Sequence, residues 1–480
     1  DALLLVCWSG TVFLAGLCGS MLLYRAIFHR IGHFPGPFAA RLSNLYHMSV
    51  MAGTNNQYHL HIPKLQKKYG DFIRTGPREV TVLRASAVNL IYGPSSKCIK
   101  ATWYDQNSGN PDKVGIENVR DKDKHGIRRR AWDKGLGLKS LRMYESRIKD
   151  KVDDFMLRLG TDGPLNVTQE TSFYAWDVLG EIAFSVDFRM LKTGIEHPAV
   201  DGLHWAMATA GVITNFPWLM NMLRVIPGAT GRFQNFADWC YEQVDNKSAA
   251  LALQKAEGRE QEPRDVMSWL IKAHQDGDRS APPTESAIRE DARTLISAGS
   301  DTVALAFTNF LYFMAKSPSI YEKLQRLLDD EFPSRSPEDW TDLRNPASPA
   351  SRPHWFPARD APEGLQVDEV FIPGGVNVNV PIWSIHRDER YFDRALDFVP
   401  ERWEKLSPDR TAAYMPFLRG PFQCSGKAVA MMQLRMLISC VALRYDLAFA
   451  PGEDGEEFWA GAKETMTLWV PPLRLVFKHR

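Results

Sequence analysis

The sequence has few cysteines and no excess of charge of either sign. Its six cysteines among 480 residues are scattered without a Cys-x-x-Cys pair, which excludes a dense disulfide framework and gives no support to a zinc ribbon or a thioredoxin-type site. Because 58 basic residues face 57 acidic ones, binding to nucleic acid through bulk charge is not expected. The chain also lacks Gly-x-Ser-x-Gly, His-Glu-x-x-His and P-loop patterns, so it offers no common hydrolase or NTPase signature.

One long apolar run stands near the start of the chain. Residues 2–24 carry no charge over 23 positions, and a helix of this length would measure about 34 Å, enough to cross a hydrocarbon core of about 30 Å. Arg25, His29 and Arg30 follow at once, so the positive-inside rule places the body in the cytosol. A cleaved signal peptide is the alternative, but its charges should precede the run and a small-x-small site should end it. We expect a retained single-pass anchor over residues 1–30.

The rest of the chain, residues 31–480, reads as one domain that is mainly α with small β-sheets, an α+β fold. With 44% hydrophobic and 11% aromatic residues, disorder is excluded as its main state. Residues 34–38 read Phe-Pro-Gly-Pro-Phe, which predicts a stiff hinge after the anchor because proline fixes φ and disfavours a helix before it. The hydrophobic patterns predict the following elements: helices over 58–69, 139–159, 285–316, 319–332 and 426–443, and strands over 72–83 and 367–380.

The most informative segment lies before the last predicted helix. Residues 417–427 read Phe-Leu-Arg-Gly-Pro-Phe-Gln-Cys-Ser-Gly-Lys, so Cys424 sits in a Gly-rich loop just before a helix N-terminus. Backbone N–H groups and the helix dipole stabilise a thiolate there, and the glycines let the backbone approach something large and flat. Thiolate is one of the axial ligands that proteins offer to haem iron. Taken alone, however, such a cysteine is more often structural.

A second motif lies inside the long apolar helix predicted over 285–316. Residues 295–302 read Leu-Ile-Ser-Ala-Gly-Ser-Asp-Thr. Glycine costs about 1 kcal/mol in a helix interior relative to alanine, and a buried acid is costly without a partner. A widened groove that holds O2, with Asp301 and Thr302 delivering protons, explains these costs. The alternative is a simple helix kink with Asp301 reaching solvent.

Together the two motifs resemble the cytochrome P450 superfamily of haem-thiolate monooxygenases, in its fungal microsomal form. The cysteine loop matches F-x-x-G-x-x-x-C-x-G, and residues 298–302 match A-G-x-D/E-T. His-Arg-Asp at 386–388 and Pro-Glu-Arg-Trp at 400–403 follow in the order that the family shows. The resemblance covers nearly the whole chain.

This resemblance implies roles for particular residues. Cys424 would be the axial ligand of the iron of haem b, and Asp301 with Thr302 would deliver protons to dioxygen. Arg129 and Arg359 would hold the haem propionates. His125 would join them, although it is equally well explained as a surface histidine in a basic run. The other residues expected to contact the cofactor lie in the two motifs: Phe417, Gly420, Gly426, Ala298 and Gly299.

The resemblance also implies partners and a location. Electrons would come from NADPH through a flavoprotein reductase, with Arg419 and Lys427 as candidate contacts around the cysteine loop. The chain would sit in the endoplasmic reticulum membrane with its catalytic domain in the cytosol. A lipophilic substrate would enter under an apolar roof, although the same residues also suit a packed core helix: Trp205, Phe216, Trp218, Leu219, Met220, Met222 and Leu223.

Two departures from the family pattern stand out. Phe422 takes the place where many members carry an arginine or histidine that faces a propionate. The family's E-x-x-R helix, whose Glu and Arg pair with the residue equivalent to Arg402, is missing, because the spacing occurs only at 117–120 and 290–293, both too early. Where the helix belongs, residues 345–362 contain prolines at 346, 349, 353, 357 and 362, each costing about 3 kcal/mol in a helix interior.

The missing helix leaves two explanations and three functions open. Either a splicing or frame error runs across residues 345–362, which the clean return of the pattern at Pro362 favours, or the chain is a degenerate member that holds haem poorly. The first function is a monooxygenase of secondary metabolism or detoxification that inserts one oxygen atom into a lipophilic substrate. The second is an inactive membrane haem protein. The third, isomerisation or dehydration without a reductase, is disfavoured because Asp301 and Thr302 are retained.

Overall fold

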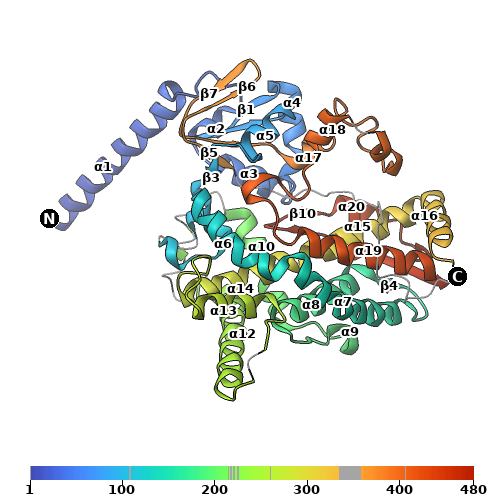
Figure 1. Ribbon diagram of the computed structural model, residues 1–480. Helices are drawn as coiled ribbons and strands as arrows, with labels where there is room; N and C mark the ends of the chain where they lie inside the picture. Colours follow the sequence, from blue (N-terminus) through green and yellow to red (C-terminus); the bar gives the residue numbers. More distant parts are fainter. Residues whose placement is uncertain are drawn as a thin grey trace.

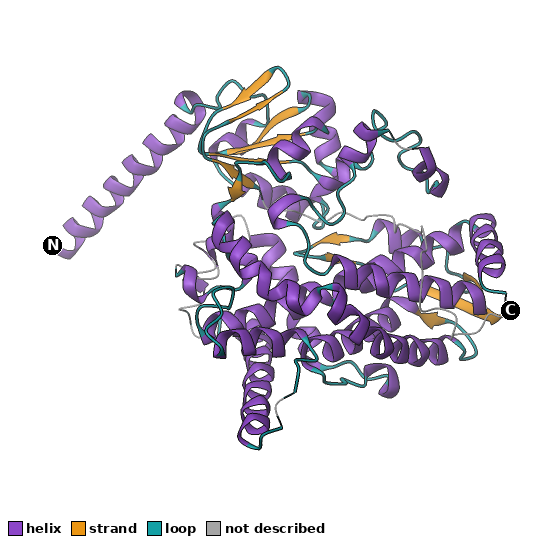
Figure 2. Ribbon diagram, in the orientation of Figure 1, coloured by secondary structure: helices purple, strands orange, loops and turns teal. Residues whose placement is uncertain are grey.

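The computed structural model describes residues 2–106, 110–213, 216, 219, 222–223, 226, 228–259, 261–333, 358–405 and 407–480. A five-stranded sheet with short helices forms one part of the body, and a larger bundle of helices forms the other (Figures 1 and 2). This arrangement confirms the prediction of a mainly α fold with small sheets.

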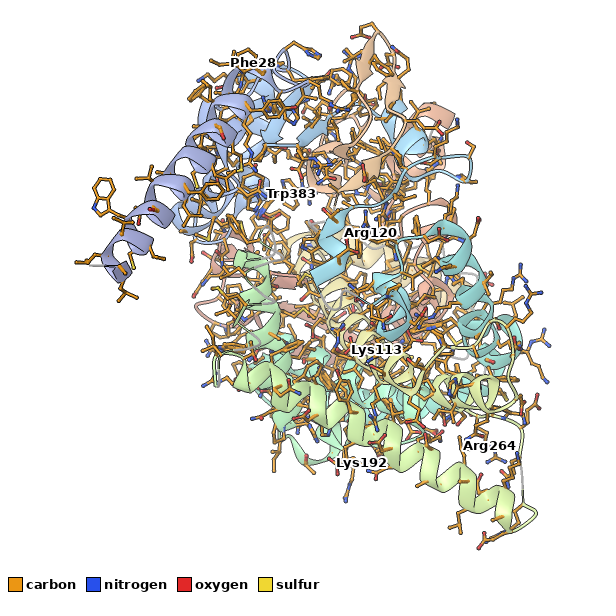
Figure 3. All side chains as sticks on the ribbon, turned by 90° about the vertical axis from the view of Figure 1, so that its left-hand side faces the viewer. Phe28, Lys113, Arg120, Lys192, Arg264 and Trp383 are labelled. Atoms are coloured by element: carbon orange, nitrogen blue, oxygen red, sulfur yellow. The ribbon has the colours of Figure 1, made fainter. Side chains whose placement is uncertain are left out.

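The apolar run forms helix α1 (Ala2–Leu23), which continues into a π-helical turn, η1 (Tyr24–Phe28). None of its side chains is buried, and α1 projects away from the body with side chains exposed around it (Figures 1 and 3). With a mean hydropathy of 2.0, the span Ala2–Phe28 is long and apolar enough to cross a membrane. Its inner end is tied to the body, since Arg25 donates to the Leu42 carbonyl at 2.8 Å.

The expected hinge lies directly against the sheet. Phe34 is 2% exposed, and the carbonyl oxygen of Pro35 accepts the backbone N–H of Arg74 at 2.7 Å. A Cβ atom at Gly36 would lie 2.3 Å from the Arg74 carbonyl oxygen, so this close approach of two backbones requires glycine. The segment therefore fixes the path of the chain from α1 into the body.

The main sheet combines strands from both ends of the body. Its strand order is β1-β2-β8-β5-β3, with β2 and β8 parallel and the other neighbours antiparallel. The predicted strand regions 72–83 and 367–380 are confirmed, but the short strands β3 and β5 carry no sequence signal and were not predicted. The strands of this sheet and of the adjoining hairpin are β1 (Phe72–Gly76), β2 (Glu79–Val82), β3 (Ile99–Lys100), β5 (Arg359–Ala361), β6 (Leu365–Val367), β7 (Val370–Ile372) and β8 (Val376–Asn379).

The helical part is built around α8 (Val167–Phe184), most of whose residues are buried. It packs against α7, α13, α14 and α15, so apolar faces from several helices meet in one core. The predicted helices are confirmed, and the long one is divided at Ser300 into α14 and α15. The longer helices of this part are α6 (Lys122–Leu136), α7 (Leu138–Leu159), α10 (Pro198–Ile213), α12 (Gly231–Ala256), α13 (Val266–Gln275), α14 (Glu285–Gly299), α15 (Asp301–Lys316), α16 (Pro318–Glu331) and α19 (Lys427–Arg444).

Short elements complete the body and bring the C-terminal segment back onto the helices. A three-stranded sheet has the order β4-β12-β9, and a separate hairpin pairs β10 with β11. These strands are β4 (Leu165–Asn166), β9 (Tyr445–Phe449), β10 (Lys463–Glu464), β11 (Leu468–Trp469) and β12 (Arg474–His479). The short helices are α2 (Phe38–Leu42), α3 (Leu45–Gly53), α4 (Ile62–Tyr69), α5 (Ser86–Tyr92), α9 (Met190–Thr193), α17 (Ile382–Ile385), α18 (Pro408–Ala413) and α20 (Glu456–Ala460), with 3-10 turns that include η5 (Ile116–Asn118) and η8 (Gly420–Phe422).

Candidate active site

Cys424 stands at the end of a tight loop that leads into α19. Its backbone N–H donates to the Phe417 carbonyl oxygen at 2.9 Å, which closes the loop on itself. Gly420 has a φ of 66°, and a Cβ atom there would lie 2.5 Å from the Tyr92 carbonyl oxygen. Position 420 therefore requires glycine, both for its positive φ and for the close contact with α5.

The thiol of Cys424 is both accessible and partly enclosed by protein atoms. The residue is solvent-accessible, yet burial raises the pKa of its thiol, against the backbone N–H groups of Gly426 and Lys427 and the positive charge of Arg129. Accessibility together with desolvation of the thiol indicates a recess rather than a flat surface. A Cβ atom added at Gly426 would meet no atom within 4 Å, so the space extends beside the loop. The N–H groups that point at the sulfur would stabilise its thiolate.

The second motif lies where α14 ends and α15 begins, around Ser300. Residues 291–297 and Ser300 are buried, whereas Ala298 between them is exposed, so this side of the helix faces open space. The Thr302 hydroxyl donates to the Ala298 carbonyl oxygen at 2.8 Å. On the opposite side, a Cβ atom at Gly299 would lie 2.7 Å from Cδ1 of Leu179 on α8. Glycine thus permits the close packing on one side while alanine leaves room on the other.

Asp301 has two side-chain neighbours from distant parts of the chain. The Thr467 hydroxyl, in the turn between β10 and β11, lies 3.3 Å from its Oδ2 atom. The Nε2 atom of His204 on α10 lies 3.4 Å from its Oδ1 atom. Burial by itself would lower the pKa of His204. The hydrogen bond to the Asp301 carboxylate and its negative charge act in the opposite direction, and the pKa is raised. Asp301 therefore contacts two side chains, whereas the alternative of a simple helix kink predicts a carboxylate that extends alone into solvent.

The three predicted propionate ligands approach the cysteine loop from two sides. On α6, Arg129 donates to the Gln423 carbonyl oxygen at 2.7 Å and to Asp133. The ring of His125, one turn earlier, lies 4.7 Å from the ring of Phe422 between centroids. From β5, the Arg359 guanidinium lies 5.0 Å from the same ring and is only 2% exposed.

Burial of His125 argues against its explanation as a surface residue. It is 5% exposed, and burial, followed by the charges of Lys100, Arg129, Arg128 and Arg359, lowers its pKa to about 2. The structure thus gathers His125, Arg129 and Arg359 around the loop that carries Cys424.

The predicted site residues therefore fall into two groups. Cys424, Phe417, Gly420 and Gly426 form the loop with the three basic residues around it, and Ala298, Gly299, Asp301 and Thr302 line the opened helix. Helix α15 packs directly on α19, which follows the cysteine loop. Of the expected roof, Trp205 lies on α10, while Trp218 and Met220 fall outside the described residues.

Comparison with known proteins identifies the family. The cytochrome P450 family model matches residues 35–345 and 354–474. The chain belongs to the cytochrome P450 family. A P450 monooxygenase of a Phoma species, eupD, is 58% identical over 57% of this chain and its own entire length. The P450 monooxygenase FCK2 of Fusarium pseudograminearum is 32% identical over 97% of this chain and 85% of its own length. Tryprostatin B 6-hydroxylase of Neosartorya fischeri is 30% identical over 99% and 87%.

The residues of this P450 fit a haem. Cys424 and Ala298 are exposed, and a Cβ atom at Gly426 would meet no atom within 4 Å, so protein atoms cover none of these three positions closely. Among the buried basic groups beside the loop, Arg359 makes no ion pair in the described ranges, and its Nε atom has no hydrogen-bond partner there. A buried cation without an anion is costly. An anionic ligand would offset that cost, and haem carries two carboxylates.

Sequence reasoning missed three residues at this P450 site: Thr467, His204 and Lys100. The first two contact Asp301, and the third is buried against Phe422. Each lies on an element distant in sequence from its partner, so no local motif could have found it. A buried lysine in a two-residue strand gives no periodic signal at all.

The Pro-rich segment coincides with the break in the family match. Residues 346–353 lie between the two matched ranges, inside the segment 345–362 that departs from the family pattern. Residues 345–357 fall outside the described ranges, while β5 and Pro362 are described. Within the described part, the Arg402 guanidinium donates to the carbonyl oxygens of Arg394 at 2.8 Å and Asp397 at 2.9 Å.

Proposed function

We propose that this P450 is a haem-thiolate monooxygenase that inserts one oxygen atom from O2 into a lipophilic organic substrate of secondary metabolism. The observation that carries the proposal is the Cys424 loop, whose N–H groups are aimed at an accessible, partly enclosed sulfur. The opened helix with Asp301 and Thr302 supports it. So do the names of the relatives, which are fungal P450 monooxygenases.

Cys424 would hold the haem iron through its sulfur. When bound, haem supplies the oxygen activation and electron transfer that amino-acid side chains lack, and a thiolate ligand favours O–O cleavage. The N–H groups of Gly426 and Lys427 would hold the sulfur as thiolate and limit its basicity. Arg129, His125 and Arg359 would bind the haem propionates.

Asp301 and Thr302 would hold and move protons. The Thr302 hydroxyl lies beside the exposed Ala298 and donates to its carbonyl oxygen, so it is positioned at the edge of the open space. Asp301 contacts His204, whose side chain is 40% exposed. A proton taken from solvent by His204 can pass to Oδ1 of Asp301, and from there towards the site.

The membrane and the reductase would meet two faces of the molecule. We infer that residues 1–30 anchor the chain in the endoplasmic reticulum and that residues 31–480 form the cytosolic catalytic domain. Lys427 is exposed at the start of α19 and suits contact with an NADPH-dependent flavoprotein reductase. Arg419 is less available for contact with the reductase, because its guanidinium donates to the Tyr414 carbonyl oxygen at 3.1 Å.

A reduced carbon monoxide difference spectrum of the full chain in microsomes tests the proposal. We expect a thiolate-type band for the wild type and its loss in Cys424→Ala, with Cys440→Ala as a matched control because that cysteine is buried in the helical core. NADPH-dependent product formation with added reductase should follow. A thiolate band that survives in Cys424→Ala would refute the assignment of the ligand.

The segment 345–362 calls for a separate experiment. We propose that the genomic and transcript sequences across these codons encode an E-x-x-R segment that is missing from the amino-acid sequence. Its absence from both, together with a wild type that binds no haem, would favour the inactive haem-protein alternative instead.

A further inference from the structure

A small polar pocket lies apart from the Cys424 loop. Its walls come from β2, β8, α17, β10 and the 3-10 turn η2 (Tyr58–Leu60), and its volume is about 50 Å³. One buried water needs about 10–15 Å³, so the polar pocket has room for a ligand of a few heavy atoms. None of the described residues of the Cys424 loop or of the motif at 298–302 lines it, which makes it a site separate from the proposed haem site.

Two carboxylates face the polar pocket without a basic partner. Glu79 on β2 and Glu464 on β10 both line it, whereas no lysine or arginine of the described ranges does. The Glu79 carboxylate accepts the Thr75 hydroxyl at 2.9 Å, and the Glu464 carboxylate accepts the backbone N–H of His59 at 3.0 Å. His47 also lines the pocket, but burial lowers its pKa to about 4, so it supplies no positive charge at neutral pH. Enclosed negative charge is costly unless a cation accompanies it.

Three polar atoms in the wall of the polar pocket have no hydrogen-bond partner in the described ranges. They are the hydroxyl oxygens of Tyr58 and Ser384 and the Nδ1 atom of His59. Tyr58 is 6% exposed and the other two residues are 7% exposed, and buried polar atoms normally have a partner. Burial raises the pKa of Tyr58, and the charges of Glu79 and Glu464 act in the same direction, so its hydroxyl lies near both carboxylates. Unpaired polar atoms and unbalanced charge thus occur at the same place.

The ammonium form of a primary amine satisfies both requirements. Its positive charge offsets the carboxylates, and its three N–H donors match the three unpaired atoms. Hydroxyl oxygens accept such bonds, and Nδ1 of His59 accepts one when the ring proton is on Nε2. Trp383, labelled in Figure 3, also lines the polar pocket, and an indole ring attracts cations. A metal ion is a poorer match, because no three His, Cys, Asp or Glu side chains among the described residues are grouped to hold one.

We propose that the polar pocket binds the ammonium group of a small primary amine. Its volume leaves room for little more than the nitrogen and the first carbon atoms of such a molecule. The headgroup of phosphatidylethanolamine is a poorer match, because its phosphate would approach the two carboxylates. The inference does not rest on the proposed monooxygenase function, and it assigns a ligand to residues that lie outside the sequence motifs.

Calorimetric titration of the full chain with methylammonium chloride tests the proposal. The reduced carbon monoxide complex is used, so that the amine does not bind the haem iron. We expect saturable binding of methylammonium and none of tetramethylammonium, which has the same charge but no N–H group. Sodium chloride at the same concentration controls for ionic strength.

A first pair of variants tests the role of charge. Glu464→Gln should weaken methylammonium binding at least about tenfold, because it removes one of the two negative charges. Glu363→Gln removes the same charge from an exposed position and should leave the affinity unchanged.

A second pair keeps the test decisive if Glu464→Gln does not fold. Tyr58→Phe removes only a hydroxyl, and we expect it to weaken binding about threefold or more. Tyr174→Phe is the matched control, because the Tyr174 hydroxyl is also buried without a partner in the described ranges but lies in the helical core, away from the polar pocket. It should bind methylammonium like the wild type.

Three results would overturn the proposal: a wild type that binds no methylammonium, a wild type that binds tetramethylammonium equally well, or equal affinities of the wild type and Tyr58→Phe. A wild type without haem would overturn the proposed function instead. The same titration then proceeds without carbon monoxide, so the two failures are distinguishable.

Discussion

We expect His386 to make the stability of this P450 sensitive to acid. It follows α17, is 9% exposed, and its Nε2 atom accepts the backbone N–H of Met415 at 3.0 Å. A protonated Nε2 could not accept that bond. Burial, followed by the charge of Arg387, lowers the pKa of His386 to about 3, whereas an unfolded histidine titrates near about 6.5.

The size of the effect follows from the difference between the two pKa values. Because the folded pKa is the lower one, the unfolded chain takes up the proton first. The contribution of neutral His386 to the free energy of unfolding is therefore fully present above about pH 6.5, and it is lost as the pH falls towards about 3. For one such group the loss is about 2 kcal/mol at pH 5 and approaches about 5 kcal/mol near pH 3. That is a large share of a typical net stability of about 5–15 kcal/mol.

Replacement of His386 by glutamine isolates this contribution. Glutamine keeps an acceptor for the Met415 N–H but does not titrate, so His386→Gln should lose about 2 kcal/mol less than the wild type between pH 7.5 and 5.0. Urea unfolding followed by tryptophan fluorescence at both pH values measures the difference. His33→Gln is the control, because His33 is exposed and its replacement should leave the pH dependence of the wild type unchanged. Parallel pH profiles for the wild type and His386→Gln would refute the reasoning.

Two further substitutions test contacts that hold the site. Asp291→Asn should lower the free energy of unfolding by about 3–5 kcal/mol, because it leaves Arg128 buried without the carboxylate that now lies 2.8 Å away. Asp133→Asn, at an exposed ion pair, should cost less than about 1 kcal/mol in the same urea titration; equal costs would contradict the argument. Gly420→Ala should abolish haem incorporation, since its Cβ atom would lie 2.5 Å from a backbone oxygen, whereas Gly231→Ala, with nothing within 4 Å, should retain the haem absorbance of the wild type.

The sequence by itself determined the features that depend on neighbouring residues. Helix periodicity and turn residues are local, so the long helices, the strand region 72–83 and the break near Ser300 could be predicted. The exposed α1 follows from composition alone. Residues 417–427 and 295–302 also carry their chemistry in continuous stretches, which is why the order of amino acids suffices to single out Cys424 and the Asp301-Thr302 pair.

Only the tertiary structure decided which distant groups meet these motifs. His204 and Thr467 reach Asp301 from α10 and from the β10–β11 turn, and Lys100 faces Phe422 from a strand too short to leave a pattern. Their positions depend on how helices and strands pack around a shared core, and on the cost of burying charge there. Such costs belong to the folded arrangement, because the same side chains are all in water when the chain is unfolded.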